Sequence, residues 1–315
     1  GYIIGKGYVL RSGTYAAVVG GVNMDIGGQS DGPLVPGDSN PGRVRISLGG
    51  VGRNIAHNMA LLGLDVRFLT AFGDDLYAQR IAASCGELGI DISQALRVPG
   101  GSTSTYLYLN GPDGDMALAV SDMDICRKMT PQFLASRLTL LKGAQLIVAD
   151  ANLPAESLRF LADHGAAPLF VDPVSTVKAE KLRPILGKIH TLKPNRMEAE
   201  LLSGVAITNE ESLRQAAQVL LDTGLRRVFI SLGSRGLFAA DHRESLLLPC
   251  RPAAPVNATG AGDAFMAGLA WAYLEGTDLR GTALAGASAG AIAIEGSETI
   301  NPALSPEVLR ARMDR

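Results

Sequence analysis

The sequence predicts an α/β fold in which helices flank a central, mostly parallel sheet. Apolar, β-rich runs alternate with helical patterns along most of the chain, which is typical of parallel strands covered on both faces. The chain has 315 residues, 47% of them hydrophobic and 19% charged, so it can bury a substantial core. Its 37 glycines suit the many tight turns that join strands to helices in such a fold.

In chain order, we expect strands at 15–22, 66–73, 145–150, 169–172, 190–192 and 227–232. Between and after them we expect helices at 54–62, 76–88, 131–141, 156–164, 198–202, 210–222 and 262–274. In the first of these helices, Ile55, Met59 and Leu62 recur on one face, and Gly63 follows as the stop.

Two regions interrupt the alternation. Residues 28–48 are rich in Gly, Pro, Asp and Ser and end in an alternating strand at 43–48, and strands at 103–109 and 116–120 flank a Gly-Pro-Asp-Gly turn. These extended pieces predict a small second sheet made from about 23–48 and 98–122, inserted into a main domain spanning 13–315. The first residues, 1–12, alternate as a separate short hairpin.

Composition excludes several classes of protein. The net charge of −2 and the lack of basic runs argue against nucleic acid as a partner. Cys85, Cys126 and Cys250 form no CxxC pair and the four histidines lack metal-ligand spacing, which argues against a disulfide framework or a zinc site. No run of about 18 apolar residues and no signal-peptide pattern occurs, so we expect a cytoplasmic protein without membrane contact.

The most informative segment is Thr259-Gly260-Ala261-Gly262-Asp263, at the start of the expected helix 262–274. Unpaired N–H groups make a helix N-terminus attractive to anions, and glycines let the backbone approach a ligand closely. Asp263 in the first turn could take a proton from a hydroxyl. An anion site beside a base is what phosphoryl transfer from ATP to an alcohol requires. The alternative is a tight turn with a capping aspartate.

The segment after strand 190–192 carries Asn195 and Glu198. Positions i and i+3 share a helix face, so the pair could hold a hydrated cation near phosphates, but a capping box needs the same spacing. After strand 227–232, Ser231, Gly233 and Gly236 form either a nucleotide-binding turn or an ordinary turn. The chain has no GxxxxGK[ST] motif, which excludes a P-loop enzyme.

Candidate residues for an acceptor lie near the N-terminus. Asn23 and Asp25 come just past the first strand, where α/β folds bind ligands, and alternation places them on the same side. A carboxylate can accept two ribose hydroxyls, although an Asx turn would use the same residues. The glycine-rich stretch from Gly50 to Asn54 opens a helix, with Asn54 either on a sugar hydroxyl or as an N-cap.

TGAGD before a small-residue helix, NxxE at 195–198 and the glycine-rich turn at 49–54 resemble the signatures of ribokinase-like (PfkB) carbohydrate kinases, over 15–315. The resemblance implies a β lid over the sugar site, a homodimer through that lid, and ATP with Mg²⁺. It implies that Asp263 is the base, that Asn195 and Glu198 support Mg²⁺ through water, and that further residues bind the nucleotide and its phosphates: Ser231, Gly233, Gly236, Thr259, Gly260, Ala261 and Gly262. A monovalent cation such as K⁺ stays open as a cofactor. Ribokinases usually carry Asp at the position of Asn257, so this chain departs from their potassium-site pattern.

Segments 23–26, 38–42, 49–56, 171–175 and 191–196 resemble one branch of that family, the bacterial pseudouridine kinases. This implies that the acceptor is pseudouridine, phosphorylated at its 5′-hydroxyl. Polar groups should select its base, with these candidates: Ser39, Asn40, Thr103, Ser104, Thr105, Asn152 and Lys178. Lys178 as a solvated helix lysine, the run 102–105 as a polar β edge and Asp172 as a loop cap remain alternatives.

Two other functions remain open. One is a kinase for ribose, another nucleoside or another sugar, with the same machinery. The other is a nucleoside-sensing transcriptional regulator, because the hairpin at 1–12 resembles the wing of a winged-helix domain, although it can equally be an added edge hairpin.

Overall fold

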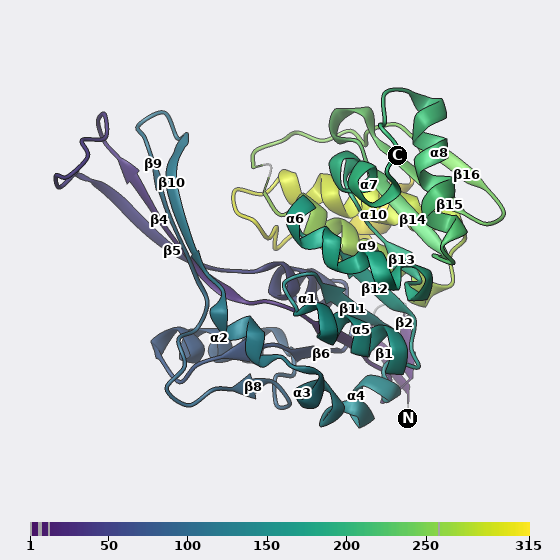
Figure 1. Cartoon of the computed structure of the whole chain (residues 1–315), viewed down its shortest axis with the longest axis horizontal. Helices are drawn as coiled ribbons and strands as arrows, with labels where there is room; N and C mark the ends of the chain where they lie inside the picture. The colour runs from purple at the N-terminus through teal and green to yellow at the C-terminus, as the bar shows by residue number, and fades with distance from the viewer. Residues whose placement is uncertain (1, 6–7, 12, 258) are drawn as a thin grey trace.

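The computed structural model describes residues 2–5, 8–11, 13–257 and 259–315. Its centre is an eight-stranded sheet in the order β16-β15-β14-β13-β12-β11-β3-β6 (Figure 1). Strands from β6 to β14 are parallel, and β15 and β16 add an antiparallel edge. The strands are β3 (Ala16–Val19), β6 (Val66–Leu69), β11 (Ile147–Asp150), β12 (Leu169–Asp172), β13 (Thr191–Leu192), β14 (Arg227–Ser231), β15 (Leu237–Asp241) and β16 (Ser245–Leu248). The predicted mostly parallel sheet is confirmed.

Helices cover both faces of this sheet. The α-helices are α1 (Val51–Leu61), α2 (Leu76–Leu88), α3 (Pro131–Ala135), α4 (Leu138–Gly143), α5 (Ala155–His164), α6 (Thr176–Ala179), α7 (Arg196–Ser203), α8 (Glu210–Asp222), α9 (Ala261–Glu275), α10 (Leu279–Ile294) and α11 (Pro306–Met313). The described residues also form the 3₁₀ helices η1 (Asp124–Lys128), η2 (Glu180–Lys188) and η3 (Gly233–Arg235). No helix in these described ranges is long and apolar enough to cross a membrane.

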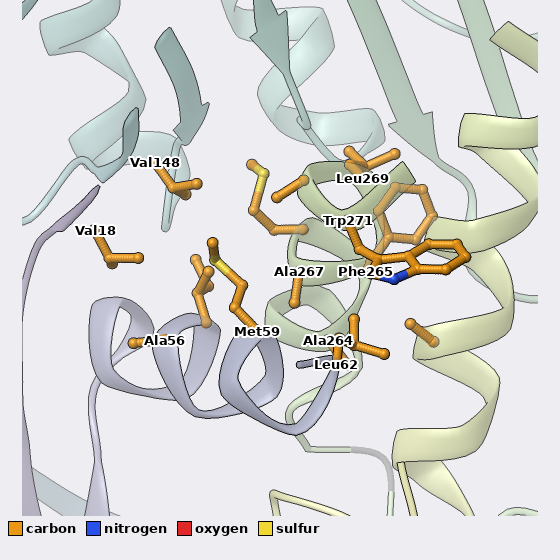
Figure 2. Packing of buried hydrophobic residues seen from close by; sticks show 14 of the residues in the cluster. Val18, Ala56, Met59, Leu62, Val148, Ala264, Phe265, Ala267, Leu269 and Trp271 are labelled. Atoms are coloured by element: carbon orange, nitrogen blue, oxygen red, sulfur yellow. The ribbon is translucent and has the colours of Figure 1, made fainter. Parts of the chain in front are cut away.

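Alternation along the central strands divides the core into two layers. On β11, Val148 packs toward α1 and α9, whereas Ile147 and Ala149 pack toward the layer that includes α5, α7 and α8. Figure 2 shows Met59 of α1 and, on the neighbouring helix α9, Ala264 and Ala267 within the first layer. This packing fixes the start of α9 against the start of α1, although the two segments are 209 residues apart at Asn54 and Asp263.

Several elements differ from the sequence prediction. The expected helix 131–141 is two helices, because the chain turns at Ser136, whose hydroxyl donates to the carbonyl of Phe133 at 2.5 Å. The pairing of α10 with α9 was not predicted. Helix α10 is apolar nearly all round and rich in Ala and Gly, so it lacks the one-sided pattern that signals a surface helix. The antiparallel strands β15 and β16 and the short helix α11 were also missed.

A second, four-stranded sheet projects from the body of the molecule (Figure 1). It has the order β10-β9-β4-β5, and its strands are β4 (Asn23–Ser30), β5 (Gly42–Gly49), β9 (Thr105–Asn110) and β10 (Met116–Asp122). β4 and β9 are parallel, while the outer pairs are antiparallel. The small sheet expected beside the main one is therefore present, and we call it the lid sheet.

Two shorter pairings complete the structure. Strands β7 (Ala71–Phe72) and β8 (Leu96–Arg97) form a parallel pair. Strands β1 (Tyr2–Gly5) and β2 (Tyr8–Arg11) form an antiparallel pair near the N-terminus.

Candidate active site

The N-terminus of α9 is open. Gly260 is its N-cap with φ 83°, and a Cβ there would lie 2.7 Å from Cγ2 of Thr299 and still closer to the Thr299 carbonyl oxygen. Only glycine fits this left-handed, crowded position. No side chain in the described part of the chain caps the helix. The first N–H groups, including those of Ala261 and Gly262, therefore have no side-chain cap, and an uncapped helix start of this kind attracts anions.

Asp263 lies in this open first turn. Its Oδ2 accepts a hydrogen bond of 3.0 Å from Nδ2 of Asn54, at the start of α1. Burial, followed by the nearby charge of Asp172, raises the pKa of Asp263 to about 7. A carboxylate with a pKa near neutral pH is suited to act as a general base.

Lys193 is a cation beside the same turn that sequence reasoning missed. Its Nζ lies 3.6 Å from Oδ2 of Asp172, and both side chains are buried. A Cβ added to Gly262 would lie 3.1 Å from that Nζ, so the ammonium lies against the first turn of α9. A cation at the positive end of a helix is disfavoured unless anions are close, and Asp172 provides one. The combination favours a second anion at the open turn.

Asp172 is itself held by an unusual loop. Val174 has φ 69°, a left-handed conformation that a β-branched residue rarely adopts, and its N–H donates to Oδ1 of Asp172 at 2.9 Å. Asp172 and Lys193 lie at the carboxyl ends of β12 and β13, the edge of the sheet where α/β folds bind ligands. This position was the sequence signal that could have marked the pair as site residues.

Asn195 and Glu198 form a capping box on α7. Oδ1 of Asn195 accepts from the Glu198 N–H at 2.8 Å, and Oε1 of Glu198 accepts from the Asn195 N–H at 2.9 Å. Burial raises the pKa of Glu198. Within the described residues, no three His, Cys, Asp or Glu side chains converge to hold a metal ion directly. A magnesium role for this pair would therefore run through water, as the sequence suggested.

The turn after β14 lies beside this helix start. The N–H of Ser231 donates to the Pro194 carbonyl at 3.0 Å, and Asn195 and Ser231 form a parallel bridge. Gly233 begins η3 one residue after the end of β14, and Gly236 is the C-cap of η3. Thr259 lies before α9, where its hydroxyl donates to Oδ1 of Asn257 at 2.7 Å.

An open cavity of about 860 Å³ runs from the α9 turn along the inner face of the lid sheet. It is lined in part by Asp25, Asn54, Thr259, Gly260 and Asp263.

Of the predicted acceptor residues, Asp25, Asn54 and Asp263 line this cavity, while Asn23 and Gly50 lie outside its lining and contact residues that form it. Nδ2 of Asn23 donates to Oδ1 of Asp25 at 2.6 Å, and burial raises the pKa of Asp25. Gly50 caps α1, and a Cβ there would lie 2.7 Å from the Gly21 carbonyl oxygen. This close approach brings Asn54 to Asp263.

Ser39 and Asn40 lie away from this cavity. They belong to the loop between β4 and β5, at the far end of the projecting sheet (Figure 1). Both strands have eight residues, which span about 26 Å. Nδ2 of Asn40 already donates to the carbonyls of Val35 and Asp38. The structure does not bring these two residues to Asp263.

The five other base-selecting candidates are also absent from the cavity lining, as far as the described residues go. The hydroxyl of Thr103 donates to Oδ1 of Asp75 at 2.7 Å and so supports the N-cap of α2, while Ser104 beside it is buried. Thr105 begins β9. Oδ1 of Asn152 accepts from Nζ of Lys178, which ties the loop after β11 to α6.

The cavity also has a basic wall that sequence reasoning missed. Arg45, Arg53, His57 and Arg80 all line it. They come from β5, α1 and α2, so no local sequence pattern reveals that they share one surface.

Comparison with known proteins places the chain among kinases. The family model described as "pfkB family carbohydrate kinase" matches residues 14–306. An Escherichia coli (strain K12) protein named "Uncharacterized sugar kinase YeiI" is 40% identical over 311 residues, covering 98% of this chain and 85% of the relative. The "Pseudouridine kinase" of the same organism is 39% identical over 298 residues, covering 94% and 95%.

Solved structures agree on the fold. A carbohydrate kinase from Agrobacterium tumefaciens has a TM-score of 0.84 at 29% identity, covering 96% of this chain and 97% of that one. A ribokinase from Thermotoga maritima has a TM-score of 0.86 at 23% identity, covering 96% and 100%. The second likeness concerns the fold alone.

Proposed function

This chain belongs to the pfkB family of carbohydrate kinases, and we propose that it transfers the γ-phosphate of ATP to the 5′-hydroxyl of pseudouridine. The observation that carries the proposal is Asp263, a carboxylate with a pKa of about 7 in an uncapped helix turn that opens on a cavity. The 39% identity to a pseudouridine kinase over nearly the full length supports this acceptor.

In this reaction, Asp263 takes the proton of the acceptor hydroxyl. Asn54 holds Oδ2 of the carboxylate and leaves Oδ1 to receive the proton. The hydroxyl oxygen forms a bond to the γ-phosphorus while the bond from that phosphorus to the bridging oxygen breaks, and ADP leaves. A pKa of about 7 means that much of the carboxylate is ionised at neutral pH.

Fixed positive charge stabilises the transferred phosphoryl group. The N–H groups of Ala261 and Gly262 point out of the open turn, and the ammonium of Lys193 lies beside them. Asp172 holds that ammonium in place. Donors that are already oriented need no rearrangement as charge develops, which is the main source of catalysis in phosphoryl transfer.

Asn195 and Glu198 fit a role in holding Mg²⁺ through water. A carboxamide and a carboxylate are the hard oxygen donors that this ion prefers, and the cap leaves Oε2 of Glu198 for a water molecule. When bound with ATP, Mg²⁺ neutralises phosphate charge. Ser231, Gly233 and Gly236 in the neighbouring turn suit the nucleotide itself.

Asp25 suits the ribose 2′- and 3′-hydroxyls. It lines the cavity, and Asn23 orients its carboxylate from the same side of β4. A carboxylate with two oxygens accepts hydrogen bonds from two neighbouring hydroxyls.

The outer face of the lid sheet supports a homodimer. It exposes an apolar stripe made of Val44, Ile46, Leu107, Leu109, Leu118 and Val120. Because an exposed apolar patch of this kind marks an interaction site, we expect a dimer in light scattering. Leu118→Asp, at a side chain that is 69% exposed, should shift the mass to that of a monomer. A wild-type monomer at micromolar concentration would contradict the dimer.

A kinase for another sugar or nucleoside is the second candidate. The sugar kinase YeiI is as similar to this chain as the pseudouridine kinase is, so similarity alone does not choose the acceptor.

The deciding experiment measures ADP release with Mg-ATP and equal concentrations of pseudouridine, uridine, ribose and adenosine. Pseudouridine turnover well above the other three supports the proposal. A clear preference for one of the others keeps the kinase and discards the acceptor. No turnover with any of the four argues for an acceptor outside this set.

A further inference from the structure

The basic wall of the cavity contains a buried arginine. Arg53 lies in the first turn of α1, next to Asn54, and its side chain lines the cavity. It is only 5% exposed. Arginine is almost never buried to this degree unless its charge is paired.

Arg53 has few partners in the described part of the chain. One terminal nitrogen donates to Oγ of Ser84 at 2.7 Å, and the other lies 3.5 Å from Nδ1 of His57. Nε is buried without a hydrogen-bond partner, and no carboxylate among the described residues forms an ion pair with the group. By contrast, the largely buried Arg312 pairs with Glu295. A buried charge left unpaired in this way is destabilising, so a ligand is the natural partner.

The surrounding groups are also donors. Burial and the charge of Arg53 lower the pKa of His57 to about 4, so the imidazole is neutral at pH 7. If Nδ1 accepts from Arg53, then Nε2 carries the hydrogen and donates. Arg45 and Arg80 line the same cavity with further N–H groups. We call Arg45, Arg53, His57 and Arg80 the donor wall.

Flat surfaces lie in the same cavity. Tyr106 and Tyr108 both line it from β9, with ring centroids 5.8 Å apart. The ring of Tyr108 lies across Gly27, where a Cβ would be 2.5 Å from Cε2. Tyrosine rings offer a flat, apolar contact for a planar base.

We propose that the donor wall, centred on Arg53, binds the carbonyl oxygens of a uracil-type base while Asp25 and Asp263 take the sugar hydroxyls. The inference rests on the proposed kinase function and assigns the residues that would recognise the base of its acceptor. Carbonyl oxygens accept hydrogen bonds from guanidinium and imidazole N–H groups. The amino group of cytosine or adenine is a donor where uracil has a carbonyl oxygen, so it would set a donor against the donor wall, which a buried polar site penalises strongly.

The test compares acceptors with and without such a base in an Arg53→Met variant. We expect kcat/KM for pseudouridine and uridine to fall on the order of 10–100-fold, mainly through KM, because a hydrogen bond to a charged group is lost. Turnover of ribose, which has no base, should change less than about threefold by the same reasoning. Arg127→Met, at an 86% exposed side chain, is the matched control.

A stability measurement separates this role from a structural one. Methionine fills much of the arginine volume without its charge, so the ligand-free variant should melt no lower than wild type. Arg53→Lys keeps a charge but loses the planar fork, and we expect it to recover only part of the lost affinity for pseudouridine. This second variant also keeps the test decisive if Arg53→Met fails to fold.

The outcomes distinguish the two proposals. If the wild type prefers uridine to pseudouridine and Arg53→Met lowers kcat/KM for uridine as expected, the proposed acceptor is overturned and the donor wall is supported. Good pseudouridine turnover that Arg53→Met leaves unchanged, or lowers equally for ribose, overturns the donor wall alone. A wild-type preference for cytidine, adenosine or a sugar phosphate also overturns it.

Discussion

The first turns of α7 and α9 each contain a carboxylate, but the two carboxylates face different partners. Each carries a carboxylate whose pKa is raised by burial, Glu198 in α7 and Asp263 in α9, and the charge of Lys193 acts on both. In α7 the carboxylate and Asn195 satisfy the helix's own N–H groups. In α9 no described side chain does so, and the carboxylate faces Asn54 and the cavity instead.

The difference shows how one helix start becomes structural and the other reactive. A capping box uses its side chains on the backbone, so the turn is stable without a ligand. An open turn keeps both its N–H groups and its carboxylate for other molecules, and it is less stable for that reason. The following substitutions test this contrast, from the largest expected effect to the smallest.

The largest effect should come from Asp263→Asn, which keeps the shape of the side chain and removes the base. We expect kcat to fall on the order of 10²–10⁴-fold in an ADP-release assay. Glu198→Gln is the matched change in the capped turn and should lower kcat far less. Near-normal turnover of Asp263→Asn would falsify the base assignment.

Gly260→Ala should be next. Its Cβ would press on Thr299 at φ 83° and displace the open turn, and a displacement of about 1 Å in a catalytic group can cost on the order of 10²-fold. Gly276→Ala, at the other end of α9, is the control, because φ is 75° but no atom lies within 4 Å of the added Cβ.

Backbone strain alone should cost each glycine substitution about 1–2 kcal/mol of unfolding free energy, and the contact with Thr299 adds to the cost of Gly260→Ala. Only Gly260→Ala should also lose activity. Equal loss of activity in the two variants would mean that α9 needs its overall stability and not its open start.

The pH profile should show the titration of Asp263. We expect kcat/KM to fall about tenfold per pH unit below a pKa of about 7, because the protonated carboxyl cannot act as a base. Since the charge of Lys193 lowers that pKa, Lys193→Met should move this limb to higher pH. If Lys193→Met leaves the acidic limb of the pH profile unmoved, the charge of Lys193 does not affect the pKa of Asp263.

The unfolding free energy should depend on the same titration in the opposite direction: protonated Asp263 favours the folded state, whereas catalysis needs the ionised form. The folded pKa of Asp263, about 7, exceeds its ordinary value of 3.8, so the folded state binds the proton more tightly. Its contribution to the unfolding free energy is therefore full below about pH 4 and is lost as pH rises to 7. Asp263→Asn should lack this decline, as denaturant titrations at pH 5 and pH 8 would show.

Sequence reasoning succeeded where the chemistry is local. The TGAGD turn and the helix after it are contiguous, so their pattern predicts the open start of α9. The Asn195 and Glu198 spacing allowed either a cap or a cation site, and the structure shows that the cap forms. Strand alternation also placed Asn23 and Asp25 on one side.

Sequence reasoning failed for residues whose role depends on tertiary packing. Lys193 and Arg53 have no pattern of their own, and only packing reveals that Lys193 lies at α9 and that Arg53 has no carboxylate partner among the described residues. Ser39 and Asn40 were expected to contact the base of the nucleoside acceptor, but the length of β4 and β5 places their loop away from the cavity. Helix α10 was missed because its apolar residues cover nearly every face.

The smallest effect should come from the capped turn. Asn195→Ala removes the cap of α7 and should lower the unfolding free energy by about 1 kcal/mol. Asn209→Ala is the matched control, because Asn209 caps α8 in the same box geometry with Ser212 and α8 carries none of the proposed ATP or acceptor residues. Denaturant titration should give similar losses for the two variants.

Magnesium dependence then separates the two caps. If Asn195 also orders water around Mg²⁺, its alanine variant should need several-fold more Mg²⁺ for half-maximal rate, about what the loss of one hydrogen bond predicts. Asn209→Ala should need no more than wild type. If both variants lose equal stability and neither changes the Mg²⁺ requirement, Asn195 is a cap alone, and α7 contributes only rigidity beside the open turn of α9.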